Sequence, residues 1–263
     1  MEIVRVRLVN SENETLGCEK APVEILNALK EIKSNESGKL ININELRLEE
    51  IHVDLSNVSE ANYLIFENSK EIFEKNFKSF FIGGDHSISY SIVRAFGKVE
   101  KNPLLIVFDA YANCCESDEN PTNRQWLRKL VESGFDSGRI VLVSARNFNE
   151  DEINFLKKSN IILIKMDVLQ EDIAGVCDIV MERARDSSGF YISIDISCVD
   201  PAYAPGTFSL ESGGLSSRDL IYFIKRLRLL ENFKGADIVE INPELDVREM
   251  TVKLGAKLLS EMI

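Results

Sequence analysis

The sequence predicts an α/β protein built on a mainly parallel β-sheet. Short apolar runs alternate with helical segments along most of its 263 residues, which is the order typical of βαβ units. Several of these runs are apolar throughout, as expected for strands that are buried. The connections are short and contain no linker, repeat or low-complexity tract, so we predict a single domain over residues 1–263.

The expected strands show two patterns. Residues 3–9 alternate apolar and charged side chains, which suits a first, half-buried strand. The later strands are short apolar runs, and the one at 80–82 stops at two glycines. After the first strand, we expect one or two strands within residues 40–55. Further strands are expected at 80–82, 103–109, 139–144, 161–164, 189–195 and 235–241.

The expected helices lie between these strands, and several begin at recognisable residues. Pro22 stands in the first turn of the first helix, where its missing N–H costs nothing. Asn57 or Ser59 is expected to cap the second, and Ser216 or Ser217 a later one. The helices are placed at 21–32, from 57 or 59 to 75, and at 87–93, 122–133, 149–158, 170–185, 216–230 and 246–262.

The amino-acid composition argues against several classes of function. The net charge of -12 and the pI of about 4.8 argue against nucleic acid or an anionic membrane as partner. They suit a cationic small ligand, or simply a solubilising surface. The five cysteines are scattered and odd in number, so no disulfide framework is expected. With no signal-peptide pattern and no apolar run that could span a bilayer, we expect a cytoplasmic protein.

Polar side chains follow four of the expected strands. They are His86, Asp109, Asp195 and Glu240. In a parallel sheet the carboxyl ends of the strands meet at one edge, so these side chains can converge. A histidine after a strand is more often structural when it stands alone, but a histidine with two carboxylates suits a divalent ion.

Four segments carry distinctive motifs, and these lead to a family. Residues 83–87 read Gly-Gly-Asp-His-Ser, and residues 109–113 read Asp-Ala-Tyr-Ala-Asn. Residues 193–201 read Ser-Ile-Asp-Ile-Ser-Cys-Val-Asp-Pro, and residues 237–243 read Asp-Ile-Val-Glu-Ile-Asn-Pro. Together and in this order, over roughly residues 17 to 263, the chain resembles the ureohydrolases, the family of arginase, agmatinase and formiminoglutamase.

The resemblance implies a fold and an activity. The fold is a three-layer α/β/α sandwich with a mainly parallel eight-stranded sheet. The activity is hydrolysis of a guanidino group to urea, or of a related formimino group, with two manganese ions held by four aspartates and two histidines. The implied ligand is a cationic guanidino molecule, and the implied assembly is a homo-oligomer, a trimer or a hexamer.

The chain departs from the family pattern at the metal ligands. Tyr111 stands where the family has a histidine, and Asn113 and Ser197 stand where it has aspartates. The positions matching one ion are His86, Asp109, Asn113 and Asp195, and those matching the other are Asp109, Tyr111, Asp195 and Ser197. The site of the second ion has lost both ligands that it does not share with the first, at Tyr111 and Ser197. We therefore expect at most one manganese ion, or none.

Two further positions are carried over from the family. Asn123 aligns with the histidine that shuttles protons to the leaving group, and an amide cannot do this near neutral pH. Glu240 matches the carboxylate that holds the guanidinium in a charge-assisted contact. The resemblance thus assigns catalytic positions to Asp109, Asn113, Asn123 and Glu240, and substrate-binding positions to Asn123 and Glu240.

Three functions remain open at this point. The first is an agmatinase-like or arginase-like hydrolase with impaired or lost activity. The second is a non-catalytic, ligand-binding or regulatory subunit, alone or paired with an active relative. The third is a hydrolase with one ion at His86, Asp109 and Asp195.

Thiols also flank the altered positions, at Cys114, Cys115 and Cys198. They could hold zinc or supply a nucleophile, or they could simply pack in the interior.

Overall fold

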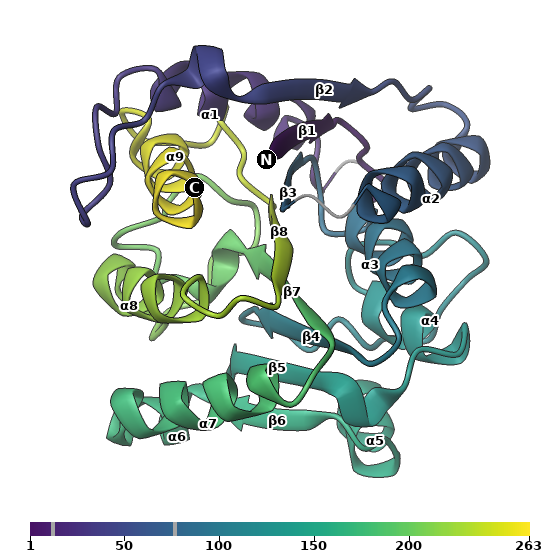
Figure 1. Ribbon diagram of the computed structural model, residues 1–263. Coiled ribbons are helices and arrows are strands. Elements are labelled where there is room, and N and C mark those ends of the chain that lie inside the picture. Colours follow the sequence, from purple (N-terminus) through teal and green to yellow (C-terminus); the bar gives the residue numbers. More distant parts are fainter. Residues whose placement is uncertain (12–13, 76–77) are drawn as a thin grey trace.

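A computed structural model describes residues 1–11, 14–75 and 78–263. In this part of the chain eight strands form one sheet, in the order β2-β1-β3-β8-β7-β4-β5-β6 (Figure 1). Every neighbouring pair is parallel, which confirms the expected sheet. The strands are β1 (Glu2–Val6), β2 (Arg47–Ile51), β3 (Ser79–Gly83), β4 (Pro103–Phe108), β5 (Ile140–Ala145), β6 (Ile162–Lys165), β7 (Gly189–Asp195) and β8 (Phe233–Val239).

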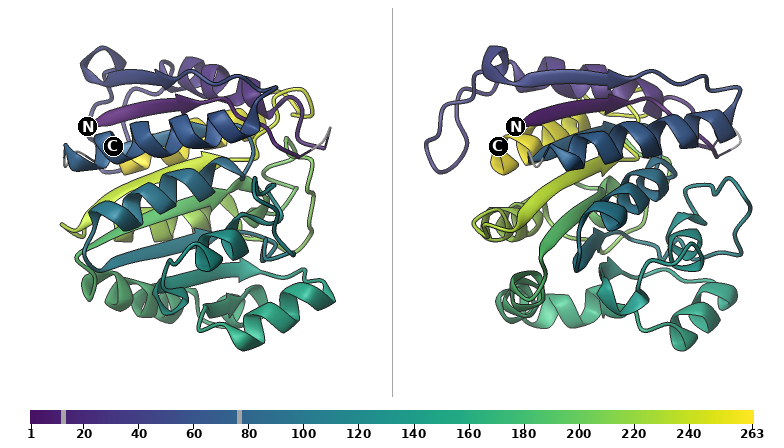
Figure 2. Two further views of the ribbon diagram at one scale, coloured as in Figure 1. Left: turned by 90° about the vertical axis from the view of Figure 1, so that its right-hand side faces the viewer. Right: turned by 45° about the vertical axis from the view of Figure 1, so that its right-hand side comes forward.

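Helices cover both faces of the sheet, so the three-layer α/β/α architecture is also confirmed (Figures 1 and 2). One face carries α1 (Ala21–Leu29), α6 (Met166–Glu171), α7 (Ile173–Arg185), α8 (Ser217–Leu227) and α9 (Met250–Met262). The other carries α2 (Val58–Glu74), α3 (Ile88–Val99), α4 (Trp126–Glu132) and α5 (Glu150–Lys158).

The two hydrophobic cores lie on opposite faces of the sheet, and single strands supply both. In β4, Leu104 and Ile106 pack into the core beneath α7 and α8, whereas Leu105 and Val107 pack into the core beneath α3 and α4. This follows from the strand geometry, because successive side chains point to opposite faces. It also explains why the central strands are apolar at every position.

Some predicted boundaries are wrong, and polar side chains explain two of the differences. The segment 170–185 is broken between α6 and α7 at Asp172, whose side chain accepts the N–H of Gly175 at 2.8 Å. The segment 246–262 becomes helical only at Met250, since the Asp246 carboxylate accepts the N–H groups of Thr251 and Val252. Such local hydrogen bonds compete with helix continuation. The helix expected over 122–133 begins at Trp126. Residues 40–55 hold one strand, β2, in agreement with the one or two expected there.

Within the described ranges, no helix is both long enough and apolar enough to cross a lipid bilayer. The five cysteines are free thiols, and four of them are buried.

Candidate functional site

Four adjacent strands at the centre of the sheet deliver the polar side chains singled out in the sequence. β3, β8, β7 and β4 are consecutive neighbours. His86 follows β3, Glu240 directly follows β8, Asp195 is the last residue of β7, and Asp109 directly follows β4. Because the strands are parallel, these ends meet at one edge of the sheet.

The turn that carries His86 depends on two glycines. A Cβ on Gly84 would lie 2.0 Å from the carbonyl oxygen of Leu8, and a Cβ on Gly83 would lie 2.3 Å from Ile88 Cδ1. Asp85 then fixes the turn, since its Oδ2 accepts hydrogen bonds from Ser11 Oγ and Thr15 Oγ1, both at 2.9 Å. The close approach of the Leu8 backbone excludes any larger residue at Gly84, whereas a Cβ on Gly83 would press on the side chains of Ile88 and Val239.

His86, Asp109 and Asp195 form a compact buried cluster. His86 Nδ1 lies 3.1 Å from Asp109 Oδ2 and 3.1 Å from Asp195 Oδ2. One ligand atom from each of the three residues lies within 4.8 Å of the others. Atoms that bind one ion at about 2.1 Å and at right angles are about 3 Å apart. The donor types and their spacing therefore fit a single divalent ion.

Asn113 adjoins this cluster. Its amide nitrogen donates to Asp109 Oδ2 at 2.6 Å and lies 3.2 Å from His86 Nδ1. Its backbone is left-handed, with φ of 53°, a conformation that asparagine tolerates better than most residues. Rotating the amide by half a turn would present its oxygen to an ion held by the cluster.

A buried hydrogen-bond chain behind His86 sets the tautomer of its ring. Ser193 Oγ donates to Asp237 Oδ1 at 2.7 Å, and it lies 3.0 Å from His86 Nε2. A hydroxyl has one proton to donate, so Ser193 must accept from Nε2–H. The neutral ring then presents its Nδ1 lone pair to the two aspartates, which is the form that a metal ligand requires.

Burial shapes the charges of the cluster. Burial by itself lowers the pKa of His86, but its hydrogen bonds to Asp109 and Asp195 raise that pKa well above the usual value. Burial, together with the charge of Asp195, raises the pKa of Asp109 to about 7. Without an ion, a proton on this cluster is therefore stabilised because it lessens the repulsion between the two carboxylates.

Within the described part of the chain, no second group of His, Cys, Asp and Glu side chains lies on the other face of the aspartate pair. Asp109 Oδ1 accepts the backbone N–H of Tyr111 at 2.8 Å and lies 3.3 Å from Ser197 Oγ. The Tyr111 hydroxyl donates to Glu211 Oε2 at 3.3 Å. Burial, followed by the charge of Glu211, raises the pKa of Tyr111 to about 12, so the phenol stays protonated at neutral pH and is a poor ligand.

Glu240 lies next to the cluster with one oxygen free. Its Oε1 accepts from the backbone N–H of His86 at 2.8 Å and from Asn123 Nδ2 at 3.2 Å. Its Oε2 is buried and has no hydrogen-bond partner among the residues that the structure describes. Burial, and then the charges of Asp195 and Asp85, raise the pKa of Glu240 well above its usual value. A cation placed against Oε2 would give this oxygen a partner and would stabilise the charged form of the carboxyl group.

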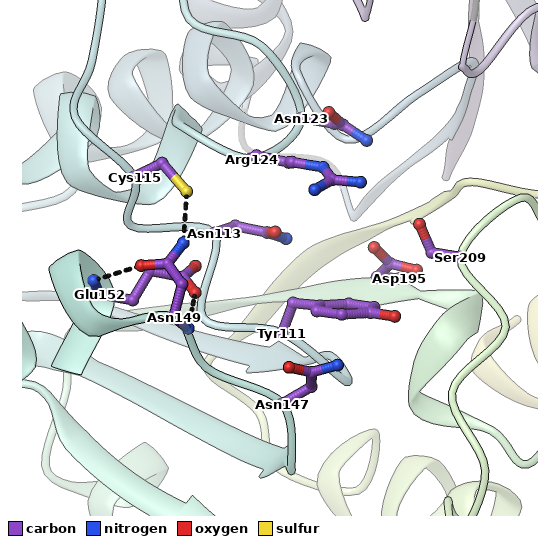
Figure 3. Close-up of a pocket in the computed structure, with 10 residues that line it drawn as sticks. All are labelled: Tyr111, Asn113, Cys115, Asn123, Arg124, Asn147, Asn149, Glu152, Asp195 and Ser209. Atoms are coloured by element: carbon purple, nitrogen blue, oxygen red, sulfur yellow. Dashed lines mark hydrogen bonds between the residues drawn. The ribbon is translucent and has the colours of Figure 1, made fainter.

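A cavity of about 320 Å³ adjoins the cluster at Asp195 (Figure 3). It is lined by Tyr111, Asn113, Cys115, Asn123, Arg124, Asn147, Asn149, Glu152, Asp195 and Ser209. Of the three thiols that flank the altered positions, Cys115 lines the cavity, and its Sγ accepts a hydrogen bond from Asn149 Nδ2 at 3.1 Å. Cys114 and Cys198 are buried, and burial raises the pKa of each, which favours packing over reactivity.

Comparison with known proteins decides the ancestry. The model of the arginase family matches residues 3–263.

The chain belongs to the arginase family.

The relatives of this arginase-family chain carry several activities. It is 27% identical to formimidoylglutamase of Bacillus subtilis (strain 168), over 98% of this chain and 84% of that protein. It is 32% identical to the mitochondrial arginase 1 of Arabidopsis thaliana, over 78% of this chain but only 58% of that protein. It is 27% identical to agmatinase of Bacillus subtilis (strain 168), over 91% of this chain and 81% of that protein.

Solved structures agree on the fold. The crystal structure of formimidoylglutamase from Bacillus subtilis superposes with a TM-score of 0.91 at 25% identity, and covers 99% of this chain and 85% of that one. Agmatine ureohydrolase of Thermoplasma volcanium superposes with a TM-score of 0.85 at 24% identity, and covers 99% of this chain and 87% of that one. The arginase family is metal-dependent, and in this member the His86, Asp109 and Asp195 cluster can hold a metal.

The structure of this arginase-family chain also shows residues that support the site from outside the metal cluster. Arg146 donates to the carbonyl oxygens of Ser197 at 2.9 Å and Glu211 at 2.5 Å, and so holds the loop after β7. Glu211 in turn binds Tyr111 and Asn147. Asp237 lay inside a motif and could have been suspected, whereas Glu211 lies in an irregular loop that gave no signal.

Proposed function

We propose that this chain holds no more than one divalent ion, at His86, Asp109 and Asp195, and that it binds a guanidino or formimino ligand against Glu240. Hydrolysis by the two-metal route is impaired or lost. The observation that carries this proposal is that Tyr111 and Ser197, two poor metal ligands, occupy one side of the aspartate pair. The Tyr111 hydroxyl is engaged with Glu211, and serine offers only a weak neutral oxygen.

The cluster supports one ion, and manganese is the metal that the family resemblance suggests. When bound, such an ion supplies Lewis acidity and lowers the pKa of a coordinated water. The protein's part is orientation. Ser193 directs the Nδ1 lone pair of His86 at the site, and Asp109 and Asp195 bring two carboxylate oxygens within 3.1 Å of it.

The ligand end of the site supports binding more strongly than turnover. A planar guanidinium pairs well with a carboxylate oxygen that is free and buried, as Glu240 Oε2 is. Asn123 orients Glu240 through its amide, but an amide cannot pass a proton to a departing amine near neutral pH. Recognition of the cation is therefore retained where proton transfer is not.

A hydrolase that works with one ion is the second candidate. The specific observation in its favour is the compactness of the His86, Asp109 and Asp195 cluster, because a single ion can bring the pKa of a bound water to about 7.

Metal content tests the proposal. The purified protein is saturated with manganese, desalted and analysed for ions per chain, and then assayed for urea release from arginine and agmatine and for formamide release from formiminoglutamate. One ion without turnover is expected, and one ion with turnover would favour the second candidate. Two ions would contradict the proposal, and no ion would leave a ligand-binding protein without a metal centre.

The two histidines of the chain provide a matched pair of variants. His86→Asn should abolish manganese binding, because it removes the nitrogen ligand from the cluster. His52→Asn should leave it unchanged, because that side chain is 86% exposed and its nearest ion-pair partner is Glu50. Equal metal content in both variants would show that the ion binds elsewhere.

Restoring the ligands that the family resemblance implies tests whether the altered residues prevent binding of a second ion. The quadruple variant Tyr111→His, Asn113→Asp, Ser197→Asp and Asn123→His should bind a second manganese ion. The single variant Asn123→His serves as the control, because it leaves every proposed metal ligand unchanged. If the quadruple variant is folded and still binds one ion, the assignment of the altered positions is wrong.

A further inference from the structure

Arg124 introduces a positive charge on the wall of the ligand cavity. Among the ten cavity residues, those with carboxyl or guanidinium side chains are Arg124, Glu152 and Asp195. In Figure 3 the guanidinium of Arg124 turns toward the same space as Asn113, on the side where Asp195 lies. The cavity wall therefore carries a carboxyl group at Asp195 and a guanidinium at Arg124.

Glu152 does not neutralise that basic wall, because its carboxylate has a structural role. One oxygen accepts the backbone N–H of Cys114 at 3.1 Å, and the other accepts the backbone N–H of Asn149 at 3.0 Å. The side chain is buried and forms the capping box of α5. It therefore stabilises the cavity wall and offers no free oxygen to a ligand.

Arg124 has donors to spare. Its described side-chain contact is an ion pair with Glu14 Oε2 at 3.1 Å, and the two side chains are 58% and 48% exposed. An exposed pair of this kind contributes about 0–1 kcal/mol. A guanidinium has five N–H donors, so Arg124 can bind a carboxylate beside Glu14 or in its place. The backbone is fixed, because its carbonyl accepts the N–H of Cys115 at 3.0 Å.

The chain places this cation next to Asn123, the cavity-lining residue that contacts the buried Glu240. Asn123 donates to Glu240 at 3.2 Å, and Arg124 is the next residue, with its Cα about 3.8 Å further along the chain. A ligand that places one end on Glu240 therefore needs only a short spacer to bring its other end to Arg124.

We propose that Arg124 makes this site selective for short guanidino or formimino acids, in which a carboxylate lies at the end opposite the cationic group. The inference rests on the proposed binding of that cationic group at Glu240. A ligand with an ammonium tail would meet the Arg124 guanidinium as a like charge, and a ligand with an apolar tail would gain nothing from it.

Calorimetry on the manganese-treated protein tests the proposal with three probes. They are 4-guanidinobutanoate with an anionic tail, butylguanidine with a neutral tail, and agmatine with a cationic tail. The wild-type protein should bind 4-guanidinobutanoate most tightly and agmatine most weakly. Arg124→Gln should weaken 4-guanidinobutanoate about tenfold, as expected for the loss of a charge-assisted contact, and leave butylguanidine unchanged.

Two further variants sharpen the test. Glu14→Gln should strengthen binding of 4-guanidinobutanoate, because it frees Arg124 from its competing partner. Lys129→Gln removes the same charge outside the cavity lining and should change none of the three affinities. An unchanged ratio between 4-guanidinobutanoate and butylguanidine in Arg124→Gln would overturn the selectivity proposal while leaving binding at Glu240 intact. Absence of binding by all three probes would overturn the proposed function and this inference together.

Discussion

At the scale of single residues, the orientation of His86 depends on groups that never face the cavity. Ser193 accepts from the ring and donates to Asp237, and Ser89 Oγ donates to the other Asp237 oxygen at 2.9 Å. All three are buried. Burial is the largest cause that raises the pKa of Asp237, while the two serine hydroxyls favour its charged form. The histidine is therefore held by a polar chain whose members depend on one another.

Removing Ser193 should loosen this arrangement. In Ser193→Ala the ring nitrogen Nε2 and Asp237 each lose a partner, so the tautomer with Nδ1 free is no longer enforced. We expect manganese affinity to fall roughly tenfold, as for other losses of a hydrogen bond behind a metal ligand. Titration calorimetry measures this loss.

Ser91→Ala is the matched control. It removes a buried hydroxyl on the same helix as Ser89, one that bonds to Asn62. If both variants bind manganese as the wild type does, then the Ser193 hydrogen bond does not orient the ligand.

The sequence could identify the altered residues but not all of their partners. Tyr111 and Ser197 stand out because the motifs around them are intact. The role of Tyr111 depends on Glu211, which lies one hundred positions away in an irregular loop and whose backbone carbonyl accepts a hydrogen bond from Arg146. No local pattern records such a contact, because it arises from tertiary packing of three separate loops.

At the scale of elements, the turn between β3 and α3 is the most constrained part of the site. Gly84 donates its N–H to the carbonyl of Val6 and accepts the N–H of Glu240. It thus joins the ends of three strands, and the missing side chain is what permits the approach. This requirement was readable from the glycine pair, whereas the identity of the neighbouring backbone was not.

Gly84→Ala should destabilise the protein strongly. Its Cβ would lie 2.0 Å from the Leu8 carbonyl oxygen, a backbone atom that cannot rotate away. We expect a loss of about 2–3 kcal/mol in the free energy of unfolding, typical of overpacking in a rigid interior, measured by urea denaturation. In Gly138→Ala the nearest atom is 3.3 Å away on the side chain of Asp136, so the change should be small. A similar loss in both variants would refute the steric explanation.

At the scale of the whole molecule, the alternation of strands and helices predicted the parallel sheet, but not the order of its strands. β3 and β4 follow one another in the sequence, yet β8 and β7 lie between them. That insertion brings Asp195 and Glu240 between His86 and Asp109. It requires the last third of the chain to return to the centre of the sheet, which periodicity alone cannot reveal. The family resemblance supplied the three layers and the eight strands, but not this order.

In the helical layer, Glu36 binds the last part of the chain to an early segment. This residue, in the segment after α1, bonds to Arg218 at 2.7 Å and to Lys225 at 2.9 Å on α8. Its backbone N–H donates to Glu261 of α9 at 2.8 Å. Glu36 therefore links an early segment to two helices from the end of the chain.

The pH dependence of stability should report this link. The hydrogen bonds from Lys225 and Arg218 lower the pKa of Glu36 from 4.5 to about 2. A carboxyl whose pKa is depressed on folding stabilises the native state above its unfolded pKa, and that contribution is lost as the pH falls through its folded pKa. The advantage of the wild type over Glu36→Gln should be about 1 kcal/mol near pH 6, since the group is partly solvated, and should vanish between pH 4.5 and about 2. Urea denaturation of both proteins across this range measures the difference. A gap that stayed constant down to pH 2 would mean that Glu36 stabilises the fold by packing alone and not by its charge.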